Sequence, residues 1–141
     1  MDDDGFSIDN NSTVKEQKPQ SLSQNGAKIE LVGCQLDASQ LLCSGYVTLS
    51  REEHFGIFSG QNPIYDPSKL VDPDGNEIMA TRVRLGSAEH SPQLWTDPVA
   101  NARLRLELTF EDVPENLTEI PVVLVSTSLG RFSFRKVKVS Q

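Results

Sequence analysis

The sequence has no long apolar run, and its start does not resemble an export signal. Its most apolar stretches, such as residues 121–125, are far shorter than the roughly 20 residues of a membrane-spanning helix. Met1 is followed by three aspartates and a glycine instead of the apolar segment of a signal peptide. We therefore expect no transmembrane segment. The protein is then cytoplasmic or, if a targeting segment has been removed, extracytoplasmic, in the periplasm or at the cell surface.

Positive charge is also scarce. The chain has 13 Lys and Arg against 20 Asp and Glu, which gives a net charge of −7 at pH 7. Nucleic-acid binding draws much of its affinity from Lys and Arg at phosphates. This balance disfavours nucleic acid as the partner, although a local basic face remains open.

Catalytic and metal-binding motifs are missing. The chain has no Gly-x-Ser-x-Gly, no His-Glu-x-x-His and no glycine-rich phosphate loop. Nothing in the sequence supplies an orienting partner for its two histidines, His54 and His90, as a general base requires. Neither histidine stands at a metal-ligand spacing from the two cysteines. We predict a protein that is not an enzyme and that binds no metal or cofactor.

Two parts of different composition follow one another along the chain. Residues 1–27 are rich in Asp, Asn, Ser, Gln and Lys, with too few apolar side chains to offset the entropy of ordering. From residue 28 onward, short β-branched and aromatic runs alternate with Gly, Pro, Asn and Asp. We predict a flexible, disordered acidic leader over residues 1–27 and one domain over residues 28–141.

The domain has the pattern of a strand-and-turn protein. In residues 102–110, five apolar side chains alternate with polar ones, which places them on one face of a strand but would scatter them around a helix. The turn residues of segments 72–76 and 129–130 separate further strands. We predict an all-β, immunoglobulin-like antiparallel β-sandwich of seven or eight strands. The expected strands are residues 28–36, 41–50, 55–59, 68–71, 77–85, 102–110, 119–127 and 131–139.

The last expected strand changes its apolar face part way along. Phe132 and Phe134 share one face of a regular strand, whereas Val137 and Val139 share the opposite face. A bulge near Arg135 and Lys136 would return both pairs to the core. The alternative is that the two valines lie exposed on an edge, and we favour the bulge.

The two cysteines lie on adjacent expected strands. Pairing Leu36 with Leu41 brings Cys34 opposite Cys43. A cross-strand disulfide is possible if this is a non-hydrogen-bonded pair, and we predict one. The alternative is two buried thiols that act as small core residues.

Basic side chains recur at alternate positions of three expected strands. If these strands are neighbours, they present a cationic face to an anionic glycan, a lipid head group or an acidic protein segment. The alternative is a solvated sheet face balanced by acids such as Glu77 and Glu107, with charges that protect an edge strand. The candidate residues are Arg82, Arg84, Arg103, Arg105, Arg135, Lys136 and Lys138.

Trp95 is the single tryptophan and lies in the longest expected loop, residues 86–99. Loop aromatics often contact ligands, which makes Trp95 a candidate binding residue. Alternatively, its side chain closes one end of the sandwich, and we favour this packing role.

Several short motifs along residues 28–139 are shared with a known group of domains. The motifs are Val32-Gly33-Cys34, Leu42-Cys43, Lys69-Leu70-Val71-Asp72, Gly75-Asn76-Glu77, Val83-Arg84-Leu85-Gly86, Leu108-Thr109-Phe110-Glu111-Asp112-Val113-Pro114 and Phe132-Ser133-Phe134-Arg135. The sequence resembles an uncharacterised family of bacterial, mainly cyanobacterial, immunoglobulin-like accessory domains of exported proteins. The resemblance implies the fold and an extracytoplasmic setting, and it brings no functional residue.

These observations lead to two hypotheses of function. The first is a non-catalytic accessory or binding module, extracytoplasmic, that recognises a protein, an anionic glycan or another surface polymer. The second is a structural subunit of a larger envelope or virion-like assembly, in which the leader becomes ordered against a neighbouring chain.

Overall fold

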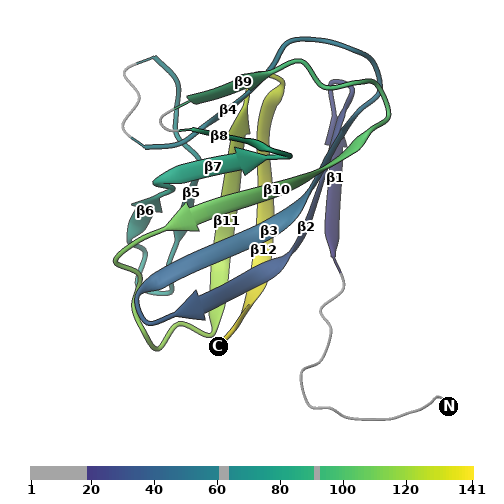
Figure 1. The fold of residues 1–141 in the computed structure, drawn as a ribbon. Coiled ribbons are helices and arrows are strands. Elements are labelled where there is room, and N and C mark those ends of the chain that lie inside the picture. Colours follow the sequence, from purple (N-terminus) through teal and green to yellow (C-terminus); the bar gives the residue numbers. More distant parts are fainter. Residues whose placement is uncertain (1–18, 61–63, 91–92) are drawn as a thin grey trace, which may run out of the picture.

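The chain forms strands and turns throughout the part that the computed structural model describes, residues 19–60, 64–90 and 93–141 (Figure 1). Twelve strands are present there, more than the seven or eight expected. They are β1 (Gln20–Gln24), β2 (Ala27–Asp37), β3 (Gln40–Leu49), β4 (Phe55–Phe58), β5 (Lys69–Val71), β6 (Glu77–Met79), β7 (Arg82–Leu85), β8 (Ala88–His90), β9 (Gln93–Thr96), β10 (Arg103–Phe110), β11 (Glu119–Thr127) and β12 (Gly130–Ser140).

The strands form two layers. The front sheet is antiparallel and has the order β1-β2-β3-β10-β7-β8. The back sheet has the order β6-β5-β11-β12, and β4 joins the end of β11 to β9. In Figure 1, β11 and β12 cross behind the front sheet, and the end of β12 pairs in parallel with β2. The predicted all-β sandwich is therefore confirmed.

Apolar side chains of both layers meet between the sheets. The buried aromatic residues include Phe55, Phe110, Phe132 and Phe134. In β10 the alternation noted in the sequence has the expected result, since the residues from Leu106 to Phe110 are buried at every second position. Each sheet therefore has one face in the core, and its other face lies outside the core.

The expected strand of residues 77–85 is two strands that belong to different sheets. Ala80 separates them and is completely buried; its N–H donates to the carbonyl of Ser68, and its carbonyl accepts from the N–H of Gly60. The chain crosses from β6 in the back sheet to β7 in the front sheet at this residue. The stretch of residues 86–99, expected as a loop, also contains two short strands, β8 and β9.

The front sheet begins at Gln20, within the stretch expected as a leader. Strand β1 pairs with β2 through a turn at Asn25 and Gly26, which have φ angles of 52° and 84°. The side-chain amide of Gln20 donates to the carbonyl of Arg135 and accepts from its N–H, at 2.6 and 3.2 Å. These bonds tie β1 to β12, so residues 20–27 belong to the folded domain. Residues 1–18 lie outside the described residues, and the leader stays a prediction for them.

The irregularity expected in the last strand has a different form. Phe134 and Val137 both face the core and Val139 is half-buried, so the alternative of exposed valines is wrong. No residue is inserted there, because the pairs Val122–Arg135 and Ile120–Val137 keep one register. The bulge predicted near Lys136 is therefore wrong. The front sheet contains a register shift instead, between Leu31 and Gly33 of β2.

The expected hairpin of residues 72–76 is confirmed between β5 and β6. The carboxylate of Asp72 accepts hydrogen bonds from the N–H groups of Asn76 and Asp74, at 2.8 and 3.0 Å. The hydrogen bond from the Asn76 backbone is the main cause that lowers the pKa of Asp72. The carboxylate is thus occupied by its own turn.

Candidate functional site

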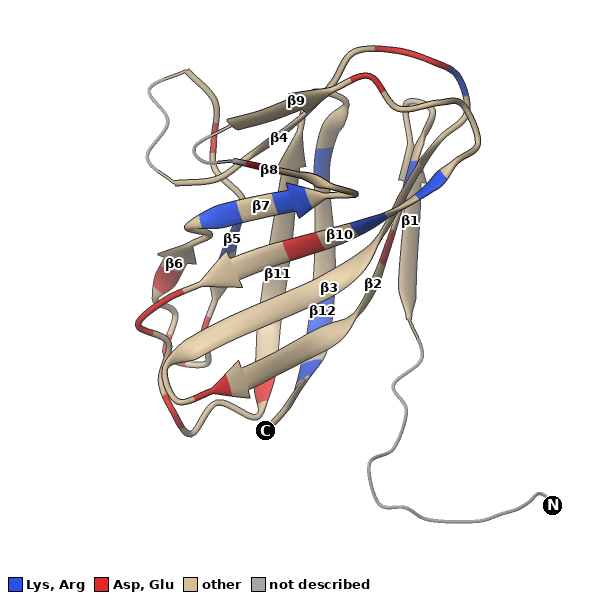
Figure 2. Cartoon of the chain, viewed as in Figure 1, with Lys and Arg blue, Asp and Glu red and all other residues tan. Residues whose placement is uncertain are grey.

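Four of the seven candidate basic residues lie together on the outer face of the front sheet. Strands β7 and β10 are paired neighbours, and alternation points Arg82, Arg84, Arg103 and Arg105 away from the core. Each of the four side chains is more than half exposed. We call this surface the arginine face; Figure 2 shows its blue segments on β7 and β10.

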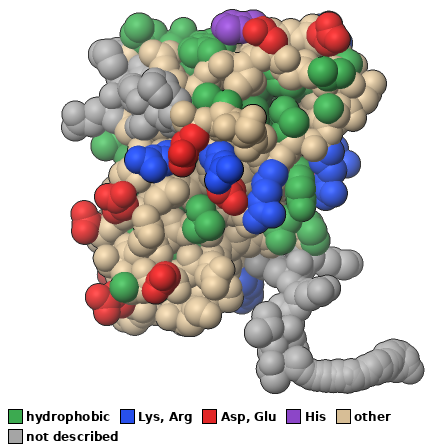
Figure 3. Space-filling view, viewed as in Figure 1, with side chains coloured by type: hydrophobic (Ala, Val, Ile, Leu, Met, Phe, Trp, Pro, Cys, Tyr) green, Lys and Arg blue, Asp and Glu red, His purple; other side chains and the backbone are tan. Residues whose placement is uncertain are grey.

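Acidic side chains are interspersed with these arginines. Arg82 contacts Glu89 at 3.6 Å, and Glu107 lies between Arg84 at 4.0 Å and Arg105 at 3.2 Å. Blue and red side chains accordingly alternate across the middle of the surface in Figure 3. Such exposed pairs contribute little to stability. A third acid, Glu30 of β2, contacts Arg103. The arginine face is therefore a mixed surface with four positive and three negative charges.

Arg103 is held in place more firmly than the other three. Its Nε donates to Oε1 of Glu30 at 3.3 Å, and its guanidinium carbon lies 3.6 Å from the ring centroid of Tyr46. Stacking on an aromatic ring leaves the edge of a guanidinium free to donate hydrogen bonds. Arg103 is thus an oriented cation on this surface.

Arg103 also ends a line of polar residues that crosses four strands. Ser23 of β1 is opposite Lys28 of β2, Lys28 is opposite Thr48 of β3, and Thr48 is opposite Arg103 of β10. We call these four residues the polar row. It contains two cations and two hydroxyls and no acidic residue.

A pocket of about 330 Å³ opens over this end of the sheet. It lies where the β1–β2 turn, the end of β3 and the segment before β10 meet, and Asn101, with a φ of 65°, donates its N–H to the carbonyl of Leu49 there. Its polar lining residues are Ser23, Gln24, Lys28, Thr48, Ser50 and Asn101. Sequence reasoning found none of these residues.

The other three candidate basic residues lie elsewhere. Arg135, Lys136 and Lys138 are exposed on β12, which pairs with β11 in the back sheet. Lys138 donates to Glu119 of β11 at 2.6 Å, and this hydrogen bond is the main cause that lowers the pKa of Glu119. The seven residues therefore do not form the single face that the sequence pattern suggested.

Trp95 belongs to an aromatic layer on the outer side of β4. Its ring stacks on His54, with centroids 4.8 Å apart, and meets Phe58 and Tyr65 edge-on at 5.6 and 6.2 Å. A Cβ on Gly56, which is opposite Trp95, would lie within 2.9 Å of the indole, so a glycine is needed there. These contacts give Trp95 a packing role against β4.

His54 of the aromatic layer has an acidic partner. Its Nδ1 lies 3.0 Å from Oδ1 of Asp97, and both side chains are mostly exposed. In the described residues no three His, Cys, Asp or Glu side chains come together in a way that could hold a metal ion. No helix long and apolar enough to cross a membrane occurs among these residues.

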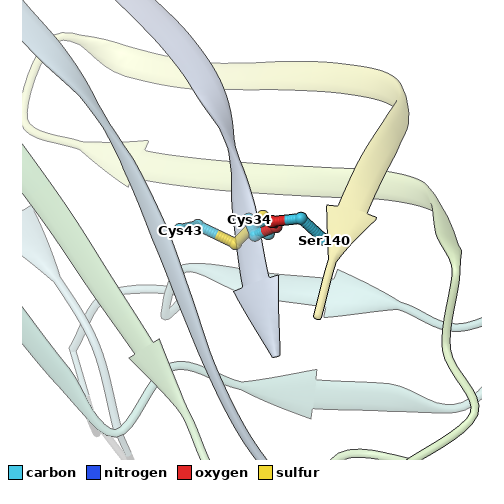
Figure 4. The surroundings of a disulfide bond; sticks show 3 residues. All are labelled: Cys34, Cys43 and Ser140. Carbon is cyan, nitrogen blue, oxygen red and sulfur yellow. A yellow bond between two sulfur atoms is a disulfide. The ribbon is translucent and has the colours of Figure 1, made fainter. Parts of the chain in front are cut away.

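Cys34 and Cys43 form a disulfide bond, as predicted, and both are buried (Figure 4). They are opposite each other in the β2–β3 hairpin, which closes with the pair Asp37–Gln40. Because pair types alternate from the closing pair, Cys34–Cys43 is a non-hydrogen-bonded pair, the type with the closer side chains. The hydroxyl of Ser140 donates to the carbonyl of Cys34 at 3.4 Å, beside the parallel pairing of β12 with β2.

No protein-family model matches the chain, and no curated protein matches it. The fold is similar to a solved structure described as an apo PmoF2 PCuAC domain, with a TM-score of 0.53. The likeness covers 86% of this chain and 95% of that chain, at 8% sequence identity. At this identity it concerns the fold, and the chain shares with that domain an all-β sandwich architecture.

Proposed function

We propose that this domain is a non-catalytic binding module whose arginine face recognises an anionic polymer. The observation that carries the proposal is that four exposed arginines, Arg103 and Arg105 on β10 and Arg82 and Arg84 on β7, lie on the outer face of two paired strands. Four exposed guanidinium groups on neighbouring strands offer planar donors to carboxylates or sulfates. A polymer with repeated anionic groups can displace the exposed glutamate partners, because each of these surface pairs is weak.

The disulfide supports an extracytoplasmic setting for this module. Both cysteines of the chain are used in the Cys34–Cys43 bond. Disulfides persist in the periplasm and at cell surfaces and are rare in reducing cytosol. Surface polymers of these compartments are commonly anionic, which agrees with the class of partner.

The proposal is tested with two double variants of equal charge change. Arg103→Glu with Arg105→Glu alters the arginine face, and Arg135→Glu with Lys136→Glu alters β12. Each double variant lowers the net charge by four. Immobilised heparin at low ionic strength is the probe, and the salt concentration at elution is measured. We expect the first variant to elute at clearly lower salt and the second to elute close to the parent protein. The neutral pair Arg103→Gln with Arg105→Gln should show the same loss in a milder form.

Two outcomes would contradict the proposal. One is equal loss in both charge-reversed variants, which would mean that only net charge matters. The other is a parent protein that heparin does not retain at low ionic strength. Thermal unfolding of each variant shows whether the fold is intact, so loss of binding is separated from loss of structure.

A further inference from the structure

The pocket over the polar row offers a more specific site than the open arginine face. We infer that it binds one saccharide unit that carries a carboxylate or sulfate group, so that the anionic polymer of the proposed function is a polysaccharide. The inference rests on that proposed function and goes further by naming the class of ligand. The volume of about 330 Å³ lies at the lower end of the range for small-molecule pockets, about 300 to 1,000 Å³.

The carboxylate or sulfate group of the ligand would bind the ammonium group of Lys28. Its side chain is exposed, and none of the carboxylates in the described part of the chain forms an ion pair with it. This distinguishes Lys28 from Arg82, Arg84, Arg103 and Arg105, each of which contacts a glutamate. A ligand at Lys28 has no glutamate to displace. The nearest acid on β2, Glu30, is already bonded to Arg103.

The remaining polar groups of the pocket both donate and accept hydrogen bonds. Ser23, Thr48 and Ser50 provide hydroxyls, and Asn101 provides an amide. The side-chain oxygen of that amide accepts hydrogen bonds and cannot donate them. Sulfate or a bare carboxylate cannot donate to this oxygen. A sugar hydroxyl can, and this is why a polyhydroxylated anion fits the lining better than an inorganic one.

The polar row also gives the site a direction along a polymer. Arg103 is opposite Thr48, and its guanidinium crosses β3 over Tyr46 toward Glu30 of β2, beside the polar row. Glu30 accepts a hydrogen bond from its Nε and the Tyr46 ring packs against one face of the guanidinium, which leaves the terminal nitrogens for a ligand. The next anionic unit of a polysaccharide that is anchored at Lys28 would reach these nitrogens. The chain of sugars then continues over the arginine face toward β7.

Titration of the isotope-labelled protein by NMR tests the site directly. The ligands are a hyaluronan tetrasaccharide, which has carboxylates only, a sulfated dextran oligosaccharide, neutral maltotetraose and polyglutamate. We expect the two anionic saccharides to shift the backbone amides of Lys28, Thr48 and Asn101, and whichever binds more tightly identifies the anionic group. Maltotetraose should bind at least tenfold more weakly, and polyglutamate should leave the pocket amides unshifted.

Two variants sharpen the assignment. Lys28→Gln removes the cation and Thr48→Val removes a hydroxyl with little change of shape; each should weaken saccharide binding about tenfold. Lys136→Gln, an exposed lysine on the back sheet, is the matched control and should bind as the parent does. Because Thr48 is only half-buried on the outer face, its substitution leaves the core intact.

The outcomes separate this inference from the proposed function. If heparin is retained through Arg103 and Arg105 but the oligosaccharides shift no pocket amides, the pocket assignment is wrong and the binding module stands. If polyglutamate shifts the pocket amides as strongly as the saccharides do, the ligand is an acidic polypeptide and the saccharide is excluded. If heparin is not retained at all, the proposed function itself fails.

Discussion

The two long hairpins of this domain accommodate a change of apolar face along a strand in different ways. In β2–β3 and in β11–β12, the apolar side chains of one strand change from odd to even positions, or the reverse, part way along. In β2 the change occurs between Leu31 and Cys34, and the partner strand β3 keeps every second residue buried without a break. An extra residue in β2, Val32, absorbs the difference and lies exposed.

In the second hairpin both strands change face at the same level. Phe134 and Val137 of β12 are buried, and so are their partners Val123 and Ile120 of β11. Lys136 has a φ of 53°, and the register is the same on both sides of it. A break in the apolar pattern of one strand therefore indicates a bulge only where the partner strand has no matching break.

The largest effect is expected where the bulged hairpin brings two backbones together. Gly45 of β3 is opposite Leu31, and a Cβ built on it would lie 1.9 Å from the carbonyl oxygen of Glu30. Backbone cannot move aside as a flexible side chain can, so we expect Gly45→Ala to lower the free energy of unfolding by at least about 3 kcal/mol. Chemical denaturation measures the change.

Gly75 provides the matched control for this substitution. Its φ is 87° and a Cβ there would meet nothing within 4 Å, so Gly75→Ala tests backbone conformation without a clash. We expect it to cost about 1 kcal/mol. If Gly45→Ala costs no more than Gly75→Ala, the close approach of β2 and β3 at the bulge is wrong.

The second effect concerns the disulfide, which only the bulged hairpin has. Replacing Cys34 and Cys43 by alanine opens a loop closed at a sequence separation of 9, and the chain-entropy model gives a loss of about 2–3 kcal/mol. The reduced parent protein should lose a similar amount when its unfolding is measured under reducing conditions. Agreement of the two values assigns the loss to the cross-link and not to the smaller alanine side chains. Unchanged stability after reduction would contradict a structural role for the bond.

The sequence was sufficient for the fold class and for the local pairings. The alternation in residues 102–110 identified β10, and pairing Leu36 with Leu41 placed Cys34 opposite Cys43. Local patterns suffice here because the strands are consecutive. The Asn25-Gly26 dipeptide is a strong hairpin signal, but the strand before it is polar and has no apolar alternation that would mark it as a strand.

The candidate site could not be assembled in the same way. Arg103 and Arg135 lie on strands that look alike in sequence, yet β10 belongs to the front sheet and β12 pairs with β11 at the back. Strand order within a sheet depends on non-local contacts. The pocket also depends on the bulge, since an unbroken register from the Leu36–Leu41 pair would put Lys28 opposite Leu49. The shift brings Lys28 opposite Thr48 and completes the polar row.

The smallest effect on the free energy of unfolding is expected at Lys136, where β12 of the second hairpin changes its buried face. Lys136 holds a left-handed conformation that costs a side-chain-bearing residue about 1–2 kcal/mol and glycine much less. Glycine also has more freedom to lose on folding, so we expect Lys136→Gly to raise the free energy of unfolding by only about 0.5 kcal/mol. Arg135→Gly, at the neighbouring exposed position, should instead lower it by about 0.5–1 kcal/mol, because no left-handed strain is relieved there. Equilibrium denaturation of both variants shows whether their changes in the free energy of unfolding have opposite signs. If both glycines destabilise equally, Lys136 is not strained, and β12 would then need an inserted residue, as β2 has, to turn Val137 into the core.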